Sequence, residues 1–257
     1  MQAAKPVYCL SLRLLSVGLI ALLCACATPR PDPLPVPPEP SKTRQVTIAM
    51  LGATGLAGSY ILNQALAQGY DVRVLARTPS KLDRYAGRIA VVKGDARDSE
   101  TIAELLRGAD VVVSALGPVK ADGDSAKMIN SSVTADIIRQ MPDFGIKRYI
   151  MVSGAAVLMP GDDRDASGWL MRELVQLRLH SELVDKQAEY EELAQSSVDW
   201  ILVRCPLIEP EPFAAAPIVS LTTPPAWSVR AGDLAYFIIE QIQSNEYVRK
   251  GPMVGSR

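Results

Sequence analysis

The sequence predicts an α/β domain built on a doubly wound parallel sheet, and three observations support this prediction. Strand-like and helix-like segments alternate along the chain. The strand-like segments are apolar almost without interruption, as in Val111-Val112-Val113, which is typical of strands buried on both faces. A glycine-rich loop at residues 52–58 joins the first strand-like segment to the first helical one. A parallel sheet with helices on either side accounts for all three.

The elements follow in chain order from hydrophobic periodicity. Short apolar runs rich in β-branched residues predict strands at residues 46–51, 72–76, 89–93, 111–115, 149–153 and 200–203. Apolar residues at helical spacing predict helices at residues 56–68, 101–106, 125–140, 168–194 and 234–243. Gly69 follows the first of these helices as a stop signal. One domain over residues 45–257 accounts for the whole alternation.

The residues before this domain look like a secretion leader. Lys5 and Arg13 precede an apolar run at residues 14–23, which is shorter than the roughly 20 residues of a transmembrane helix. The run ends in Leu23-Cys24-Ala25-Cys26, which resembles a bacterial lipobox with Cys26 as the lipidated residue. Cys24 stands where that motif usually has alanine, serine or valine. We therefore expect a lipoprotein-type signal peptide at residues 1–25; an ordinary signal peptide or an uncleaved apolar anchor is the alternative.

Residues 26–44 are predicted to hold the lipidation site and a proline-rich linker. Between Thr28 and Pro40 almost every second residue is proline, and such a run stays extended. It would tether the domain to a membrane at the periplasmic face of a bacterial cell envelope; a cytoplasmic or otherwise membrane-anchored protein is the alternative. Cleavage before Cys26 would leave only Cys205 free, so no intrachain disulfide is expected.

Composition disfavours two classes of function. The net charge is −1 and no basic run is present, so nucleic acid is not an expected partner. With three phenylalanines and one histidine, the chain offers little for base stacking or for a histidine-rich metal site, and we predict no metal.

The glycine-rich loop predicts a phosphate site. Residues 52–58 read Gly52-Ala53-Thr54-Gly55-Leu56-Ala57-Gly58, a G-x-x-G-x-x-G pattern between a strand and a helix. Such a turn presents backbone N–H groups and the positive end of a helix to a pyrophosphate. The predicted cofactor-binding residues here are Gly52, Thr54, Gly55, Leu56 and Gly58. A purely structural turn is the alternative reading, because short glycine patterns also arise by chance.

The ends of the next two predicted strands indicate which dinucleotide binds. Where NAD-specific sites place a carboxylate for the ribose hydroxyls, this chain has Arg77 and Lys81, which could hold a 2′-phosphate. We therefore predict NADP (NADPH) in preference to NAD; a solvated basic turn is the alternative. After the third strand, Asp95 could accept a hydrogen bond from the adenine amino group. Asp98 is suited to cap the following helix.

The ends of the fourth and fifth predicted strands are assigned to the reacting end of the site. Ser114, Leu116 and Gly117 lie in a small-residue stretch that would let a ribose and nicotinamide approach the backbone. Ser153 places a hydroxyl where a substrate would react; it could equally satisfy the end of the strand. Both groups are predicted because ligands of parallel sheets bind at the carboxyl ends of the strands.

Several sequence blocks together resemble the atypical short-chain dehydrogenase/reductases, the NAD(P)H-binding group that includes biliverdin reductase B and flavin reductase. They are T-I-A-M-L-G-A-T-G-L-A-G, V-R-V-L-A-R-T-P-S-K, V-V-K-G-D-A-R-D, G-I-K-R-Y-I-M-V-S, V-D-W-I-L-V-R-C-P and S-V-R-A-G-D-L-A. The resemblance covers nearly the whole domain and implies a Rossmann-like fold and a nicotinamide cofactor. Function follows less directly, since this fold hosts many activities.

One departure from this resemblance bears on the chemistry. Family members that act on ketones and alcohols carry Tyr-x-x-x-Lys, whose tyrosine protonates the alkoxide. Here Lys186 matches the lysine, but Glu182 replaces the tyrosine, and Tyr190 lies beyond the lysine. His180 could face the same cleft, although a lone histidine on a long helix more often lies at the surface.

The predicted function follows from that departure. A flavin, quinone or linear tetrapyrrole spreads the added charge over a conjugated system, so solvent can supply the proton. The sequence thus favours an NADPH-dependent reductase of a small conjugated acceptor, with Ser153 and Lys186 at the reacting end. The alternative is a non-catalytic dinucleotide-binding sensor or envelope interaction module, because an exported chain would leave its cytoplasmic cofactor behind. A nucleotide-sugar epimerase or dehydratase is disfavoured by the missing tyrosine.

Overall fold

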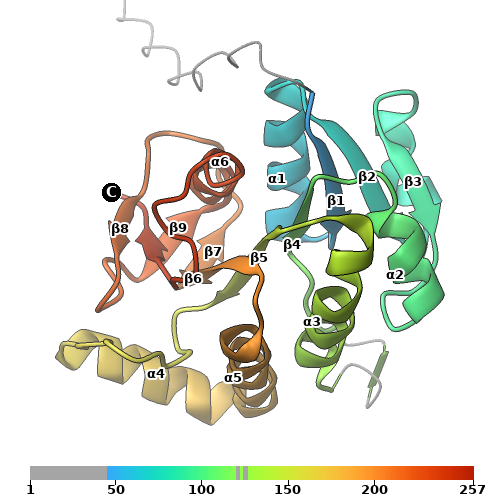
Figure 1. Ribbon diagram of the computed structural model, residues 1–257. Helices are drawn as coiled ribbons and strands as arrows, with labels where there is room; N and C mark the ends of the chain where they lie inside the picture. The colour runs from blue at the N-terminus through green and yellow to red at the C-terminus, as the bar shows by residue number, and fades with distance from the viewer. Residues whose placement is uncertain (1–44, 120–121, 124–126) are drawn as a thin grey trace, which may run out of the picture. The chain divides into compact units, whose positions relative to one another are not determined.

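The computed structural model describes residues 45–119, 122–123 and 127–257, and within them an eight-stranded sheet carries helices on both faces (Figure 1). Its strands lie in the order β3-β2-β1-β4-β5-β6-β10-β8, and only the β10–β8 pair is antiparallel. The predicted doubly wound parallel sheet is thereby confirmed. The signal peptide, Cys26 and the proline-rich linker lie outside the described residues. The strands are β1 (Thr47–Leu51), β2 (Asp71–Ala76), β3 (Ala90–Lys93), β4 (Val111–Ser114), β5 (Arg148–Gly154), β6 (Asp199–Cys205), β8 (Ile218–Ser220) and β10 (Met253–Gly255).

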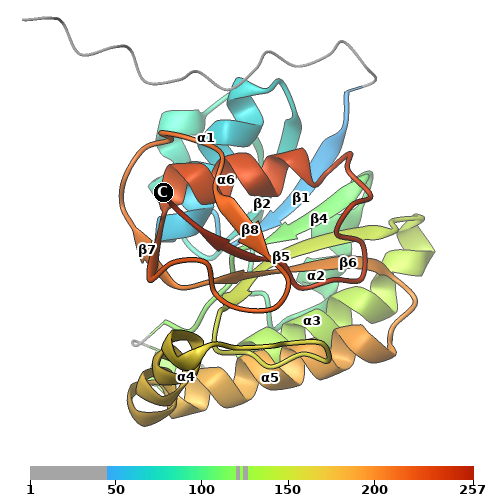
Figure 2. The same ribbon diagram turned by 90° about the vertical axis from the view of Figure 1, so that its left-hand side faces the viewer.

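The helices divide between the two faces of the sheet (Figure 2). One face carries α1 (Leu56–Ala67) and α6 (Ala231–Glu240), which pack against each other. The other carries α2 (Ser99–Leu106), α3 (Ile129–Gln140) and α5 (His180–Gln195). Short 3-10 helices, η1 (Pro79–Tyr85) and η3 (Met141–Phe144), follow β2 and α3. In the portion of the chain described, no helix combines the length and apolarity needed to cross a bilayer.

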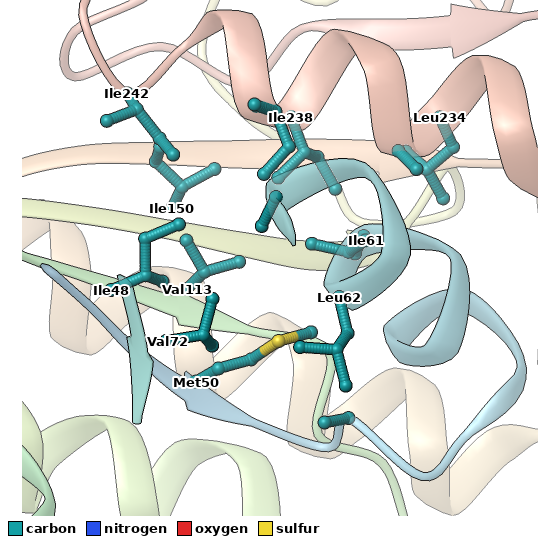
Figure 3. Close-up of a cluster of buried hydrophobic side chains, with 14 of the residues drawn as sticks. Ile48, Met50, Ile61, Leu62, Val72, Val113, Ile150, Leu234, Ile238 and Ile242 are labelled. Atoms are coloured by element: carbon teal, nitrogen blue, oxygen red, sulfur yellow. The ribbon is translucent and has the colours of Figure 1, made fainter. Parts of the chain in front are cut away.

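Alternation of side chains along the strands divides the hydrophobic core into two clusters. In a strand, successive side chains point to opposite faces. Met50 accordingly joins Ile61 and Leu62 of α1 in the cluster beneath α1 and α6 (Figure 3). Its neighbour Leu51 packs on the opposite face with Leu105 of α2. Burial on both faces explains why the strands read as continuous apolar runs.

The structure departs from the predicted elements in its second half. The single helix predicted at residues 168–194 is two helices, α4 (Ala166–Arg178) and α5, separated at Leu179, whose φ of −133° and ψ of 41° are not helical. No glycine or proline marks that break. The described part of α3 begins at Ile129, and the predicted start at residue 125 lies outside the described residues.

Four strands of three residues each were not predicted. β8 and β10 extend the main sheet, while β7 (Leu207–Glu209) and β9 (Ser228–Arg230) form a separate two-stranded sheet. Three residues are too few for an alternation to be recognised in the sequence. β10 and β8 lie at the edge of the main sheet beyond β6, away from β1 and β4, where the strand order reverses.

Candidate functional site

A cavity of about 590 Å³ lies where β1, β2, β3 and β4 end. It is bordered by Leu51, Ala76, Gly94 and Ala115, at or just beyond the carboxyl ends of these strands. Parallel sheets bind ligands at this edge, at the point where strand order reverses, and the volume is typical of small-molecule sites. The predicted residues that line the cavity are Gly52, Thr54, Gly55, Arg77, Lys81, Asp95, Leu116 and Gly117.

The three glycines of the loop occupy three different environments. Gly52 has a φ of +75°, and a Cβ there would lie 2.3 Å from the carbonyl oxygen of Ala115. A Cβ on Gly58 would lie 2.0 Å from the carbonyl oxygen of Gly52, so α1 can approach the loop only at a glycine. Gly55 precedes α1, lines the cavity and donates its N–H to the Gly52 carbonyl at 3.0 Å. The loop is therefore tightly packed behind and open toward the cavity.

The entry to α1 is suited to an anion. The helix begins at Leu56, directly after Gly55, and its first turn contains no acidic residue. The positive end of its dipole and the N–H groups of its first turn remain available to a negatively charged ligand. Leu56 and Gly58, both predicted to bind cofactor, are not among the lining residues: Leu56 is half exposed and Gly58 packs behind the loop.

Arg77 lies in the cavity wall but already has an anionic partner. Its Nη1 donates to both carboxylate oxygens of Asp122, at 2.8 and 2.6 Å, and Asp122 also lines the cavity. Lys81 lies in η1 and borders the same cavity. No ion pair of the Lys81 side chain occurs among the residues that the structure describes. The predicted basic pair is present, with one member engaged by a carboxylate that the sequence analysis did not identify.

Asp95 borders the cavity and forms an ion pair with Arg97. Arg97 donates from Nε to Oδ1 at 2.9 Å and from Nη2 to Oδ2 at 2.5 Å. Hydrogen bonding from the Arg97 side chain is the main reason that the pKa of Asp95 falls to about 2. Asp95 is therefore an ionised acceptor at neutral pH, as its predicted contact with adenine requires. The predicted cap at Asp98 is confirmed, since its side chain accepts from the N–H of Glu100 at 3.2 Å.

Ser114 lies behind the cavity wall instead of in it. Its hydroxyl is buried and accepts a hydrogen bond from the N–H of Leu116 at 3.3 Å. Leu116 and Gly117 do line the cavity. Ser114 thus shapes the turn that carries two of the predicted contacts, and we assign it no direct contact.

Ser153 and Lys186 are the residues predicted for the reacting end, and neither borders the cavity. The Ser153 hydroxyl is buried at the end of β5, and among the described residues it has no hydrogen-bond partner. Lys186 Nζ donates to the Val152 carbonyl at 3.0 Å and to Glu189 Oε2 at 2.9 Å. The lysine therefore reaches β5 beside Ser153, but its ammonium is already paired with Glu189.

Glu189 belongs to a buried polar network that sequence reasoning missed. Its other oxygen accepts from the Thr134 hydroxyl at 3.1 Å, and that hydroxyl lies 3.1 Å from the Tyr149 hydroxyl. Burial raises the pKa of Glu189, and the Lys186 ammonium opposes that rise. Burial also raises the pKa of Tyr149 far above its usual value. The network joins α3, α5 and β5 through buried hydrogen bonds.

Asp185 is a second missed residue, and it anchors the start of α3. Its carboxylate accepts four hydrogen bonds, from the N–H and side-chain amide of Asn130 and from the N–H and hydroxyl of Ser131. Ile129, just before them, lines the cavity. The signal available in the sequence was spacing: Asp185, Glu189 and buried Leu193 recur every four residues on one face of α5.

The other candidates near Lys186 lie elsewhere. His180 is exposed and its Nδ1 lies 2.8 Å from the side-chain nitrogen of Gln176. Glu182, four residues before Lys186, accepts from the Ser181 hydroxyl. Tyr190 packs edge-on against Trp200, with ring centroids 6.1 Å apart. Within the described ranges, no group of three or more potential metal-binding side chains is present.

These features fit a dinucleotide. The glycine turn admits no side chain at Gly52 or Gly58, and the helix that follows it begins without an acidic residue. A turn and helix start of this kind are suited to a pyrophosphate. The basic pair Arg77 and Lys81 lies beside them, where an adenosine ribose would bind.

Comparison with known proteins agrees with this geometry. Residues 52–245 match the sequence profile of a family described as NAD(P)H-binding. Cinnamoyl-CoA reductase 1 of Petunia hybrida is 24% identical over 182 residues, which cover 63% of this chain and 54% of the relative. The chain therefore spans about half the length of that curated relative.

Solved structures agree at the level of the fold. An anaerobillin reductase, ChuY from Escherichia coli O157:H7, superimposes with a TM-score of 0.69 at 18% identity, covering 82% of this chain and 97% of that one. A candidate exported protein from Burkholderia pseudomallei gives a TM-score of 0.63 at 22% identity, covering 82% and 100%. At these identities the likeness shows the fold alone. The profile match spans most of the chain and includes the glycine loop, so this protein belongs to the family of NAD(P)H-binding proteins.

Proposed function

We propose that this protein is an NADPH-dependent reductase that transfers hydride to a small conjugated acceptor of the flavin, quinone or linear tetrapyrrole type. The observation that carries the proposal is the cavity at the ends of β1 to β4, which combines the glycine loop with Arg77 and Lys81. The bound cofactor would supply the hydride. The protein would supply binding, orientation and exclusion of water.

Each part of the cavity has a role in this proposal. Gly55 and the start of α1 hold the pyrophosphate, and Arg77 and Lys81 hold the adenosine ribose and its 2′-phosphate. Asp95 accepts from adenine. Leu116 and Gly117 let the nicotinamide half lie against the backbone beyond β4.

The proposed acceptor class rests on what surrounds Lys186. Glu182 occupies the position four residues before it, and Glu189 and the Val152 carbonyl hold its ammonium. With Glu182 at that spacing, Lys186 has no tyrosine four residues before it to activate. A conjugated acceptor needs no positioned proton donor, because the added charge is delocalised and water can protonate the product. The anaerobillin reductase among the solved structures is consistent with this class.

Titration of the purified full chain with NADPH and with NADH, followed by tryptophan fluorescence, tests the cofactor assignment. We expect saturable NADPH binding that weakens at least about tenfold in Arg77→Ala, the cost of losing a charge-assisted contact. NADH binding should change much less. Arg88→Ala, an exposed arginine outside the cavity lining, is the matched control. Absence of saturable binding of either dinucleotide would contradict the proposal.

A second candidate is a dinucleotide-binding sensor or envelope interaction module without turnover. It is favoured by the state of the two predicted catalytic groups: Ser153 is buried without a partner among the described residues, and Lys186 is paired with Glu189. Oxidation of NADPH in the presence of FMN or a quinone separates the candidates. Turnover above the rate without protein supports the reductase, and tight binding without turnover supports the sensor.

We further propose that the chain is a lipoprotein of a bacterial cell envelope, cleaved before Cys26 and anchored there. The support is the lipobox-like sequence and the proline-rich residues that follow it. Labelling cells with a radioactive fatty acid should mark the wild-type chain and leave Cys26→Ser unlabelled. Equal labelling of both would refute the anchor.

A further inference from the structure

The Arg77–Asp122 ion pair joins two separate walls of the cavity. Arg77 follows β2, and Asp122 belongs to the segment between β4 and α3, 45 residues away in sequence. The Asp122 side chain is 14% exposed and that of Arg77 is 42% exposed, so the carboxylate is the more enclosed partner. Both line the cavity, so the guanidinium proposed to receive a phosphate is in contact with a carboxylate there.

We infer that Asp122 is a specificity-determining residue whose carboxylate competes with the 2′-phosphate of the dinucleotide for the Arg77 guanidinium. This inference rests on the proposed dinucleotide function. A 2′-phosphate that contacts Arg77 also approaches Asp122, and like charges in contact repel strongly. A dinucleotide without that phosphate leaves the pair intact. Asp122 therefore lowers the preference for NADPH that Arg77 alone would give.

The neighbouring charges support this assignment. Arg97, which pairs with Asp95, is also attracted electrostatically by Asp122, and Asp95 by Arg77. Two arginines and two aspartates thus interact with one another, three of them in the cavity wall, and the charges of these four groups cancel. Lys81 adds one positive charge at the cavity wall. Replacing Asp122 by asparagine would remove one negative charge from this group. The net charge around the cavity would then be more positive by one, which favours binding of a phosphate.

The test measures the affinity of the full chain and of Asp122→Asn for two matched pairs of ligands. The pairs are NADPH with NADH, and adenosine 2′,5′-bisphosphate with 5′-AMP. We expect Asp122→Asn to tighten binding of the two 2′-phosphorylated ligands about tenfold and of the other two less than about twofold. Asp143→Asn, which removes an exposed aspartate of η3 outside the cavity, should change none of them.

A double-mutant cycle assigns the effect to the pair. In an Arg77→Ala background, Asp122→Asn should no longer favour the 2′-phosphorylated ligands, because the shared partner is absent. Three results would overturn the inference: equal gains for all four ligands, a gain that persists without Arg77, or weaker NADPH binding in Asp122→Asn. The last would mean that Asp122 holds Arg77 in place for the phosphate. If the wild-type chain binds neither dinucleotide, the proposed function itself fails; if it binds NADPH and Asp122→Asn shows no selective gain, only this inference fails.

Discussion

At the scale of single residues, the glycine loop shows how one motif combines packing and binding. Gly52 and Gly58 are glycines because backbone oxygens stand within 2.3 Å of any Cβ placed there. Gly55 meets a milder restriction, since its Cβ would lie 3.3 Å from the Gly52 oxygen. The packing of the loop therefore requires glycine at two positions, and we propose that the third, Gly55, contacts the ligand.

This division predicts opposite behaviour for two alanine substitutions. Gly58→Ala should lower the free energy of unfolding by about 2 kcal/mol or more, because the loop or α1 must shift to admit the methyl group. Gly55→Ala should unfold close to the wild type yet bind NADPH at least about tenfold more weakly, because its methyl group enters the phosphate site. Urea unfolding and NADPH titration of both variants provide the check. Equal stability of the two variants would contradict the division.

Asp95 carries a pH-dependent contribution to stability. Its pKa falls from 3.8 to about 2 in the folded chain because Arg97 binds the ionised form. A carboxyl with a depressed pKa stabilises the folded state above its unfolded pKa, and this contribution is lost as pH falls through the folded value. The stability difference between wild type and Asp95→Asn should therefore be constant above about pH 5 and shrink from pH 4 to pH 2. Urea unfolding at pH 6, 3.5 and 2.5 measures it; a difference that grows on acidification would refute the assignment.

At the scale of elements, α5 holds α3 and β5 in place through hydrogen bonds from its side chains. Asp185 binds the first turn of α3, and Glu189 with Lys186 binds Thr134 and the Val152 carbonyl. All three side chains lie on the side of α5 that faces the sheet and α3. The helix therefore fixes where α3 begins, and through Ile129 it fixes part of the cavity wall.

Replacing Asp185 should release that anchor. Asp185→Ala leaves two backbone N–H groups, an amide and a hydroxyl without their buried acceptor, at a cost of about 3 kcal/mol. NADPH affinity should fall as well, because the cavity wall at Ile129 loses its support. Glu191→Ala, an exposed position on the same helix, is the control and should change stability by less than about 0.5 kcal/mol. Chemical unfolding and the NADPH titration together test the coupling of anchor and site.

At the scale of the whole molecule, a buried cluster of charges joins the end of the sheet to the segments around it. Arg204 of β6 is 1% exposed and donates to Gly251, Val157 and both oxygens of Asp162. Arg164 donates to the same carboxylate at 3.0 Å. One aspartate thus pairs with two buried guanidinium groups, and burial lowers the pKa of Arg204.

Removal of the shared carboxylate should therefore be severe. Asp162→Ala leaves two buried positive charges facing each other, and breaking a buried ion pair costs about 3–5 kcal/mol. Asp163→Ala, at an exposed neighbouring position, should cost less than about 0.5 kcal/mol. The difference in urea midpoint between the two variants is the measurement. Similar midpoints would show that Arg204 and Arg164 are satisfied by the backbone carbonyls alone.

The sequence by itself determined the features that depend on neighbouring residues. Continuous apolar runs located six strands of the parallel sheet, and the spacing of Gly52, Gly55 and Gly58 located the loop between β1 and α1. These signals are local, because an apolar run and a glycine turn can each be recognised from a few consecutive residues. Because the carboxyl ends of parallel strands lie at the same edge of a sheet, the sequence also predicted that Arg77 and Asp95 lie at one edge.

Only the tertiary structure decided which of those groups have partners. Arg77 meets Asp122 from 45 residues away, and Asn130 meets Asp185 from 55 residues away. Lys186 pairs with Glu189 three residues later on the same helix. The Val152 carbonyl of β5 and the Thr134 hydroxyl of α3 also contact this pair, and these contacts depend on the fold. The sequence shows which charged side chains the protein has. Which of them form ion pairs depends on the distances between them in the folded chain. The chain thus encodes the glycine loop of an NAD(P)H-binding family locally, and the fold determines which of the nearby basic residues are already paired with a carboxylate.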